Sequence, residues 1–245
     1  MLRLRQIALV AHELDPVVQS LGASFGLEVA FRDPAVETFG LHNAVLPVGN
    51  QFVEIVSPIR EGTAGGRYLE RRKGDGGYMV ILQSDHHGDR TRRVDELGIR
   101  TVLRHDGPEY CIMQLHPADT GGSFLEIDEQ IGGDDMDGPW EPAGRDWQRA
   151  RRTDVVTGIA AAELQSPDPE RLAARWSEIL ERPVGRAQDI ASIQLDNATL
   201  RFVEATDGRG EGLGGIDLIA AGQTGATDTI TDPPTSVGGL RITLV

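Results

Sequence analysis

Four polar side chains interrupt apolar, strand-like runs of the chain at a recurring spacing. Glu54 and Glu126 each lie amid Phe, Val, Leu and Ile residues. Gln6 precedes Glu54 by 48 residues, and Tyr78 precedes Glu126 by the same interval. Two carboxylates, an amide and a phenol are groups that can hold a hard cation or move a proton. The spacing therefore predicts two matched pairs of chemically active side chains.

The alternation of side chains along a strand assigns these residues to faces. Ile7 and Leu9 face away from Gln6, so one face of the first strand is wholly apolar. We expect such apolar faces to pack against helices and the four polar side chains to meet on the helix-free face, inside a curved half-barrel. Because nearby carboxylates repel and burial raises their pKa values, this site needs a bound cation or a shared proton.

The two pairs belong to repeated segments, each of which reads as a strand, a helix and three more strands. The first copy covers residues 1–60 and the second covers 61–130. In a third copy Val156 and Glu204 are again 48 residues apart, and a shortened fourth copy follows over 214–245. The predicted fold is therefore α+β, with paired βαβββ modules that form curved half-barrel sheets.

This repeat predicts two domains and a linker. The first domain covers residues 1–130, and the second, truncated domain covers 153–245. The polar segment 131–152 between them carries Trp140 and Trp147, and we expect it to pack across a surface through these two side chains. Since valine can neither ligate nor shuttle protons, Val156 leaves the second domain without a comparable site.

Local patterns place the elements of each copy. Helices are predicted over 14–25, 86–97 and 168–181, the last one from the spacing of its apolar residues and its Pro-Asp start. A strand is predicted over 28–32, after the first helix. His86 and His87 fall at the start of the second helix, and we expect both to be solvated.

Composition limits the partners of the chain. The net charge of −14 over 245 residues argues against nucleic acids and anionic membranes, both of which attract basic patches. The single cysteine, Cys111, cannot form an internal disulfide, which favours a reducing cytoplasm. The N-terminal apolar run is too short for a signal peptide or a membrane span. The expected partner is a small-molecule substrate, and a homodimer is the assembly considered.

Two motifs carry a resemblance to a known family. GRYLERRKGDGGYMVIL (66–82) and, more specifically, LHPADTGGSFLEI (115–127) resemble segments of the vicinal oxygen chelate superfamily, in its glyoxalase-like, methylmalonyl-CoA epimerase-like branch. That superfamily also includes extradiol dioxygenases and antibiotic-resistance binding proteins. The resemblance covers residues 3–129 well and is faint beyond 153. It implies a cup of paired modules around a small-molecule site.

In that family a divalent metal is held by one His, Gln or Glu from each of four strands. Carried over by position, the implied ligands are Gln6, Glu54 and Glu126, all oxygen donors, which favour Mg²⁺, Mn²⁺, Co²⁺ or Ni²⁺ over zinc. Tyr78 stands where the family usually has His, and a neutral phenol is a poor ligand for these ions. No organic cofactor is expected.

The resemblance implies an isomerase, epimerase or lyase that transfers a proton next to a carbonyl, with or without a metal. Glu126 or Glu54 would move the proton, and Tyr78 would donate a hydrogen bond to the developing oxyanion. The alternative is a protein that binds and sequesters a small molecule without chemistry. His42 could point into the cup, and Glu37 is read as a surface acid rather than a second base.

Overall fold

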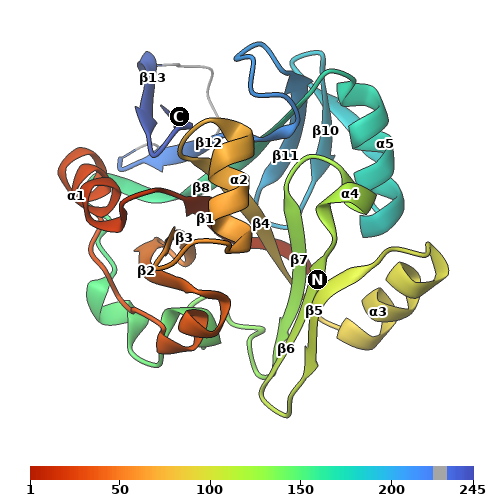
Figure 1. Ribbon diagram of the computed structural model, residues 1–245, viewed down its shortest axis with the longest axis horizontal. Helices are drawn as coiled ribbons and strands as arrows, with labels where there is room; N and C mark the ends of the chain where they lie inside the picture. Colours follow the sequence, from red (N-terminus) through yellow and green to blue (C-terminus); the bar gives the residue numbers. More distant parts are fainter. Residues whose placement is uncertain (223–230) are drawn as a thin grey trace. The chain divides into compact units, whose positions relative to one another are not determined.

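The computed structural model describes residues 1–222 and 231–245 and contains two seven-stranded mixed sheets (Figure 1). The strand orders are β2-β3-β1-β4-β7-β6-β5 and β13-β14-β12-β8-β11-β10-β9. The strands of the first sheet are β1 (Leu2–Val10), β2 (Leu41–Val48), β3 (Gln51–Pro58), β4 (Gly76–Ser84), β5 (Thr101–Asp106), β6 (Tyr110–Leu115) and β7 (Phe124–Gln130). The strands of the second sheet are β8 (Val156–Ser166), β9 (Val184–Ala187), β10 (Ile190–Gln194), β11 (Thr199–Glu204), β12 (Gly212–Ala220), β13 (Thr231–Val237) and β14 (Leu240–Leu244).

Both sheets repeat one module. In each module the first strand pairs in parallel with the last, as in β1 with β3, β4 with β7, β8 with β11 and β12 with β14. The strands that precede the last one pair antiparallel as hairpins. The α+β fold with paired modules is thereby confirmed. The predicted fourth copy over 214–245 includes residues 223–230, which lie outside the described residues.

The helices follow the predicted positions closely. They are α1 (Leu14–Phe25), α2 (Ala64–Arg72), α3 (His87–Glu96), α4 (Pro117–Thr120) and α5 (Pro169–Leu180), with 3₁₀ turns η1 (Pro34–Phe39), η2 (Glu141–Ala143) and η3 (Trp147–Ala150). The strand predicted over 28–32 is wrong, because Phe31 makes only an isolated bridge to Val45. The helices α2 and α4 were not predicted.

The chain forms two compact units, and each takes segments from both sheets. Unit 1 consists of Met1–Arg5, Tyr78–Pro139 and Ala161–Leu213. Unit 2 consists of Gln6–Gly77, Trp140–Ala160 and Gly214–Val245. The predicted domains 1–130 and 153–245 correspond to the two sheets, and their boundaries stay a prediction.

In unit 1 the helices α3 and α5 cover apolar strand faces. The face of β10 and β11 packs against α5, where the Trp176 ring meets Phe202 at 6.0 Å. The Asp168 carboxylate accepts a hydrogen bond from Arg171 N and caps α5, whose first residue is Pro169. These start signals explain why the sequence predicts this helix well.

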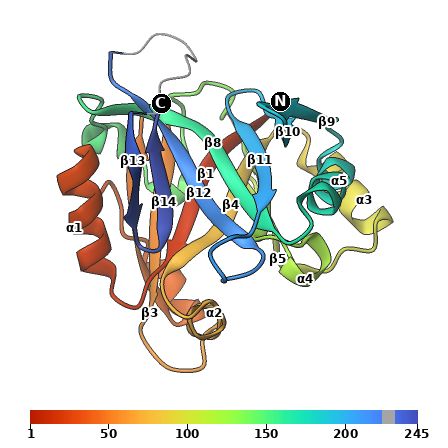
Figure 2. The same ribbon diagram turned by 90° about the horizontal axis from the view of Figure 1, so that it is seen from above.

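In unit 2 the helix α1 buries one stripe of side chains, spaced three or four residues apart: Leu14, Val17, Leu21 and Phe25. It ends at Gly26, whose φ of 70° is the left-handed conformation that glycine adopts without strain. Figure 2 shows α1 beside β13. Trp147, from the predicted linker, packs edge-on against Phe52 at 4.9 Å, and its exposed fraction is only 1%. The linker therefore contributes to the core of this unit.

Candidate functional site

Unit 2 brings Gln6 on β1 and Glu54 on β3 together. The Gln6 amide Nε2 donates to Glu54 Oε2 at 2.8 Å, and Asn43 Nδ2 on β2 donates to Glu54 Oε1 at 2.6 Å. The indole Nε1 of Trp140 donates to Gln6 Oε1 at 2.8 Å. These four buried residues form a closed hydrogen-bond network in which both Glu54 oxygens have amide donors.

The arrangement around Glu54 does not fit a divalent cation. A hard cation needs several oxygen ligands facing one point. Here the Glu54 carboxylate faces two amide N–H groups, and Gln6 turns its carbonyl to an indole N–H that cannot ligate. Desolvation raises the pKa of Glu54, while the bonds from Asn43 and Gln6 oppose that rise. The metal role expected of Gln6 and Glu54 gains no support from this geometry.

Unit 1 holds Glu126 in a different network, on β7. Gln114 Nε2, on the neighbouring strand β6, donates to Glu126 Oε2 at 3.1 Å. Glu126 also donates a hydrogen bond to the carboxyl group of Asp128, two residues along the same strand face, and this bond lowers the pKa of Asp128. Two carboxyl groups can be hydrogen-bonded to each other only when one carries a proton. The pair is therefore a site that holds an exchangeable proton.

Asp128 is the residue of this pair that the sequence analysis missed. Its exposed fraction is 0%, and the Tyr110 hydroxyl donates to its Oδ2 at 2.5 Å, while Met113 N donates to Oδ1 at 3.3 Å. Burial raises the pKa of Asp128 to about 7, against these hydrogen bonds. The signal was present in the sequence, because acids at positions i and i+2 of a strand share a face.

Tyr78 does not occupy the ladder position of Gln6. In unit 2 Gln6 pairs with Phe52 and Ala8 with Glu54, whereas in unit 1 Met79 pairs with Phe124 and Ile81 with Glu126. The interval of 48 residues therefore corresponds to a register that differs by one residue between the two copies. Met79 shares the Glu126 face, since Gln114 Nε2 also lies 3.6 Å from Met79 Sδ. The buried Tyr78 ring packs against Phe124 at 5.0 Å.

The third copy departs further from the predicted register. Glu204 pairs with Ser166, at the opposite end of β8 from Val156. The pairing of Val156 with Glu204 was therefore wrong, and the equal spacing in this copy is a coincidence. Glu204 itself is exposed.

The sheet face beside the Glu126–Asp128 pair continues across β4 to β1. Gln83 is the ladder partner of Asp128, and its Oε1 accepts hydrogen bonds from Arg3 Nε and an Arg3 terminal nitrogen at 3.1 and 2.9 Å. Beyond β7 the chain turns back, and residues 132–138, here called the strap, cover this arginine. The strap is a part of the predicted linker that the sequence did not place.

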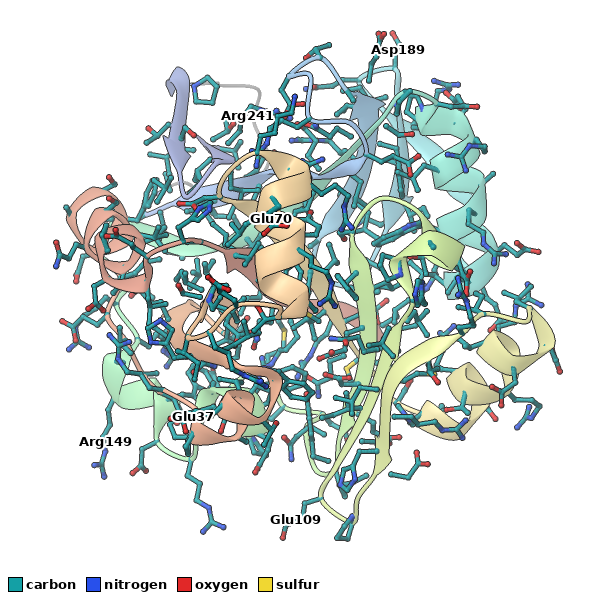
Figure 3. The ribbon with its side chains drawn as sticks, viewed as in Figure 1. Glu37, Glu70, Glu109, Arg149, Asp189 and Arg241 are labelled. Atoms are coloured by element: carbon teal, nitrogen blue, oxygen red, sulfur yellow. The ribbon has the colours of Figure 1, made fainter. Side chains whose placement is uncertain are left out.

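A shallow depression of about 240 Å³ lies in unit 2, lined by Arg32, Asp33, Pro34, Glu37, His42 and Asn43. This volume is below that of ordinary ligand sites. Glu37 lies in η1 and is exposed, as expected of a surface acid (Figure 3). His42 is exposed. Because side chains alternate along β2, its neighbour Asn43 points to the sheet face that carries Glu54, and His42 does not.

His86 and His87, both expected to be solvated, differ in their exposure. His86 is exposed as expected, but His87 has an exposed fraction of only 3%, and burial lowers its pKa.

Within residues 1–222 and 231–245, no three His, Cys, Asp or Glu side chains form a group that could hold a metal ion. Among the helices of these ranges, none is long and apolar enough to cross a membrane.

Comparison with known proteins supports the fold. A hypothetical protein from Staphylococcus aureus superposes with a TM-score of 0.71 at 12% identity, covering 100% of this chain and 99% of that one. Methylmalonyl-CoA epimerase from Streptomyces coelicolor, in complex with 2-nitronate-propionyl-CoA, gives 0.47 at 25% identity over 52% of this chain and 96% of that one. The Mycobacterium tuberculosis epimerase gives 0.46 at 22% identity over 58% and 91%. No curated protein matches the sequence.

A family model assigns the sequence to a protein family. The model of the glyoxalase-like domain matches residues 7–180, which is well over half of the chain. The matched range begins one residue after Gln6 and includes Asn43, Glu54, Trp140 and the Glu126–Asp128 pair. The chain therefore belongs to the glyoxalase-like domain family, and the resemblance to the vicinal oxygen chelate superfamily is confirmed.

Proposed function

We propose that this protein transfers a proton at a carbon next to a carbonyl of a small molecule, with Glu126 as the base. The observation that carries the proposal is the hydrogen-bonded Glu126–Asp128 carboxyl pair, whose buried member has a pKa raised to about 7. A group that titrates near neutral pH is suited to general acid–base catalysis. Glu126 is the more accessible member, with an exposed fraction of 8%.

In the proposed step, Glu126 carboxylate takes the proton from the carbon, and the electron pair moves onto the carbonyl oxygen. The Gln114 amide, which already contacts Glu126, is placed to donate to that oxygen. Return of a proton to the same face of the carbon regenerates the substrate with solvent exchange, and reprotonation on the opposite face gives the epimer. Asp128, held by Tyr110, keeps Glu126 oriented and supplies or accepts its hydrogen bond as the charge changes.

This assignment revises two roles drawn from the sequence. Tyr110 is the phenol that contacts the carboxyl pair in the proposal, in place of Tyr78. Glu54 is assigned to the closed network with Gln6 and Asn43 and not to the proton transfer. No step depends on a metal, because the donor arrangement around Glu54 does not fit one.

A sequestering protein is the second candidate. The low exposure of Glu126 and the complete burial of Asp128 favour it, because a carbon acid must reach the base directly. The two candidates differ in a single measurable property. An enzyme exchanges the substrate proton with solvent, whereas a binding protein leaves it in place.

The test is deuterium incorporation from D₂O into a panel of 2-oxo acids and acyl thioesters, followed by NMR. The wild-type protein is expected to speed exchange for at least one compound. Glu126→Gln, which keeps the shape and removes the base, should lower that rate by roughly 10²–10⁴-fold. The matched control is Glu204→Gln, an exposed glutamate at the end of β11, which should leave the rate unchanged. Equal rates for wild type and Glu126→Gln would reject the proposal.

A further inference from the structure

The strap lies over two buried arginines of β1. Arg3 donates to the main-chain oxygens of Gly133 at 2.8 Å and Asp135 at 3.3 Å. Arg5 donates to the main-chain oxygens of Met136 at 2.9 Å and Gly138 at 3.4 Å. Four carbonyls of one short segment thus accept hydrogen bonds from the two guanidinium groups.

The third donor to the strap is Gln83, whose Nε2 donates to the Gly133 oxygen at 3.0 Å. Gln83 is also the ladder partner of Asp128. Adjacent strands lie about 4.8 Å apart, so the arginine–glutamine cluster and the Glu126–Asp128 pair are neighbours on one sheet face. A ligand that contacts both groups would place one end at Arg3 and Arg5 and its acidic C–H group at Glu126.

The strap supplies negative charge as well as oxygen atoms. Buried cations need a compensating charge. Burial lowers the pKa of Arg5 to about 9 and also lowers that of Arg3, while the strap carboxylates oppose both shifts. Those carboxylates are Asp134, Asp135 and Asp137, and all three side chains are exposed.

The main-chain oxygens of the strap accept bonds from both arginines, and none of its four non-glycine side chains is buried: Asp134, Asp135, Met136 and Asp137. Segments with few buried apolar contacts open at a lower free energy than core strands. The strap carbonyl oxygens that these arginines contact are weaker acceptors for guanidinium than a carboxylate that offers two charged oxygens. An anionic ligand can therefore replace the strap oxygens with stronger acceptors.

We propose that Arg3, Arg5 and Gln83 recognise a carboxylate of the substrate, and that the strap occupies this subsite until the ligand displaces it. This rests on the proposed function, because it names the substrate class of the same site as an anionic carbonyl compound. The strap acids compete with the ligand for the arginines and thus lower its affinity.

The experiment uses oxalate as the probe, with neutral oxamide as its uncharged counterpart, in titration calorimetry at constant ionic strength. The strap variant D134N/D135N/D137N keeps the length of the strap and removes its charge. It is expected to bind oxalate at least tenfold more tightly than the wild type, and neither protein should bind oxamide. The control variant E13Q/D154N/D189N makes the same change in net charge at exposed positions elsewhere and should match the wild type.

A second measurement distinguishes displacement of the strap by oxalate from binding of oxalate elsewhere on the protein. Oxalate should speed amide hydrogen exchange in residues 132–138 of the wild-type protein. Equal oxalate affinity in the wild type and the strap variant would overturn the inference, and so would slowed or unchanged exchange in the strap.

The outcome is also separable from that of the proposed function. If oxalate does not bind while Glu126→Gln still abolishes deuterium exchange, only the carboxylate subsite is wrong. If oxalate binds and displaces the strap while Glu126→Gln keeps wild-type exchange, the subsite stands and Glu126 is not the base.

Discussion

Asp128 and Glu126 illustrate how two acids on one strand acquire different properties. Asp128 has an exposed fraction of 0% and accepts hydrogen bonds from Tyr110 and Met113 N, whereas Glu126 has an exposed fraction of 8% and contacts Gln114. Burial without a cationic partner favours the protonated form of a carboxyl group. Burial therefore raises the pKa of Asp128 to about 7, although hydrogen bonds from Tyr110, Glu126 and Met113 N oppose the rise.

This proton links stability to pH. The pKa of Asp128 is raised to about 7 in the folded protein, above its value in the unfolded chain, so the folded state binds a proton that the unfolded state has released. Its stabilising contribution is complete below the unfolded pKa and is lost as pH rises through the folded value. The difference in unfolding free energy between wild type and Asp128→Asn should shrink by roughly 2–4 kcal/mol from pH 4 to pH 7. Urea unfolding at a series of pH values measures it, and a constant difference would contradict the assignment.

The phenol of Tyr110 should tune the same carboxyl group. Its hydrogen bond lowers the pKa of Asp128 and partly offsets burial. Tyr110→Phe removes that donor, so the pKa of Asp128 should rise further and unfolding free energy should fall by about 1–3 kcal/mol. The midpoint of the pH profile of deuterium exchange should shift upward. A shift downward would mean that Tyr110 acts in some other way on the pair.

At the scale of elements, the strap depends on a close approach that only glycine permits. A Cβ atom at Gly133 would lie 2.5 Å from Gln83 Nε2 and 2.8 Å from the Gln130 oxygen, whereas a Cβ at Gly132 would meet nothing within 4 Å. Gly132 has a φ of 73°, so alanine there is strained without a clash. The pair therefore offers a matched comparison of two adjacent substitutions.

Gly133→Ala should lift the strap and accelerate amide exchange over residues 132–138, with a loss of about 1–3 kcal/mol in unfolding free energy. Gly132→Ala should cost about 1 kcal/mol through its backbone conformation and leave strap exchange close to that of the wild type. Hydrogen-exchange mass spectrometry checks both. Equal exchange in the two variants would show that the contacts of Gly133 do not hold the strap.

Element positions were largely predictable, and register was not. The helices α1, α3 and α5 lie where the repeat places them, and α5 also has the apolar spacing and the Pro-Asp start that predict a helix locally. Ladder partners depend on the lengths of helices and loops between the strands, so equal sequence intervals need not give equal registers. Met79 rather than Tyr78 therefore takes the position across from Phe124, and Ser166 rather than Val156 pairs with Glu204.

The site was predictable in part for the same reason. Gln6 and Glu54 stand out as polar residues in apolar runs, and the structure brings them together. The role of Gln6 and Glu54 depends on their hydrogen bonds with Trp140, from a distant segment, and with Asn43, from a neighbouring strand. No local pattern announces such contacts. Asp128 carried a local signal, but its burial depends on how unit 1 packs around it.

For the molecule as a whole, the proposed proton transfer uses carboxyl groups alone. We expect Mn²⁺, Co²⁺, Ni²⁺ and a chelator to leave the melting temperature of the purified protein unchanged, since the Glu54 carboxylate faces hydrogen-bond donors. Differential scanning calorimetry with each ion checks this. A rise in melting temperature that Glu54→Gln abolishes would show that the network rearranges to hold a cation.

The most direct test of the central claim is a pH titration of the side-chain carboxyl carbons by NMR, comparing wild type with Asp128→Asn and Glu126→Gln. We expect one carboxyl signal that titrates near pH 7 in the wild type, is absent from Asp128→Asn, and titrates at a different pH in Glu126→Gln because the partner carboxyl is gone. If every carboxyl of the wild-type protein titrates below about pH 5, as unperturbed acids do, the pair holds no proton at neutral pH and the proposed chemistry has no basis.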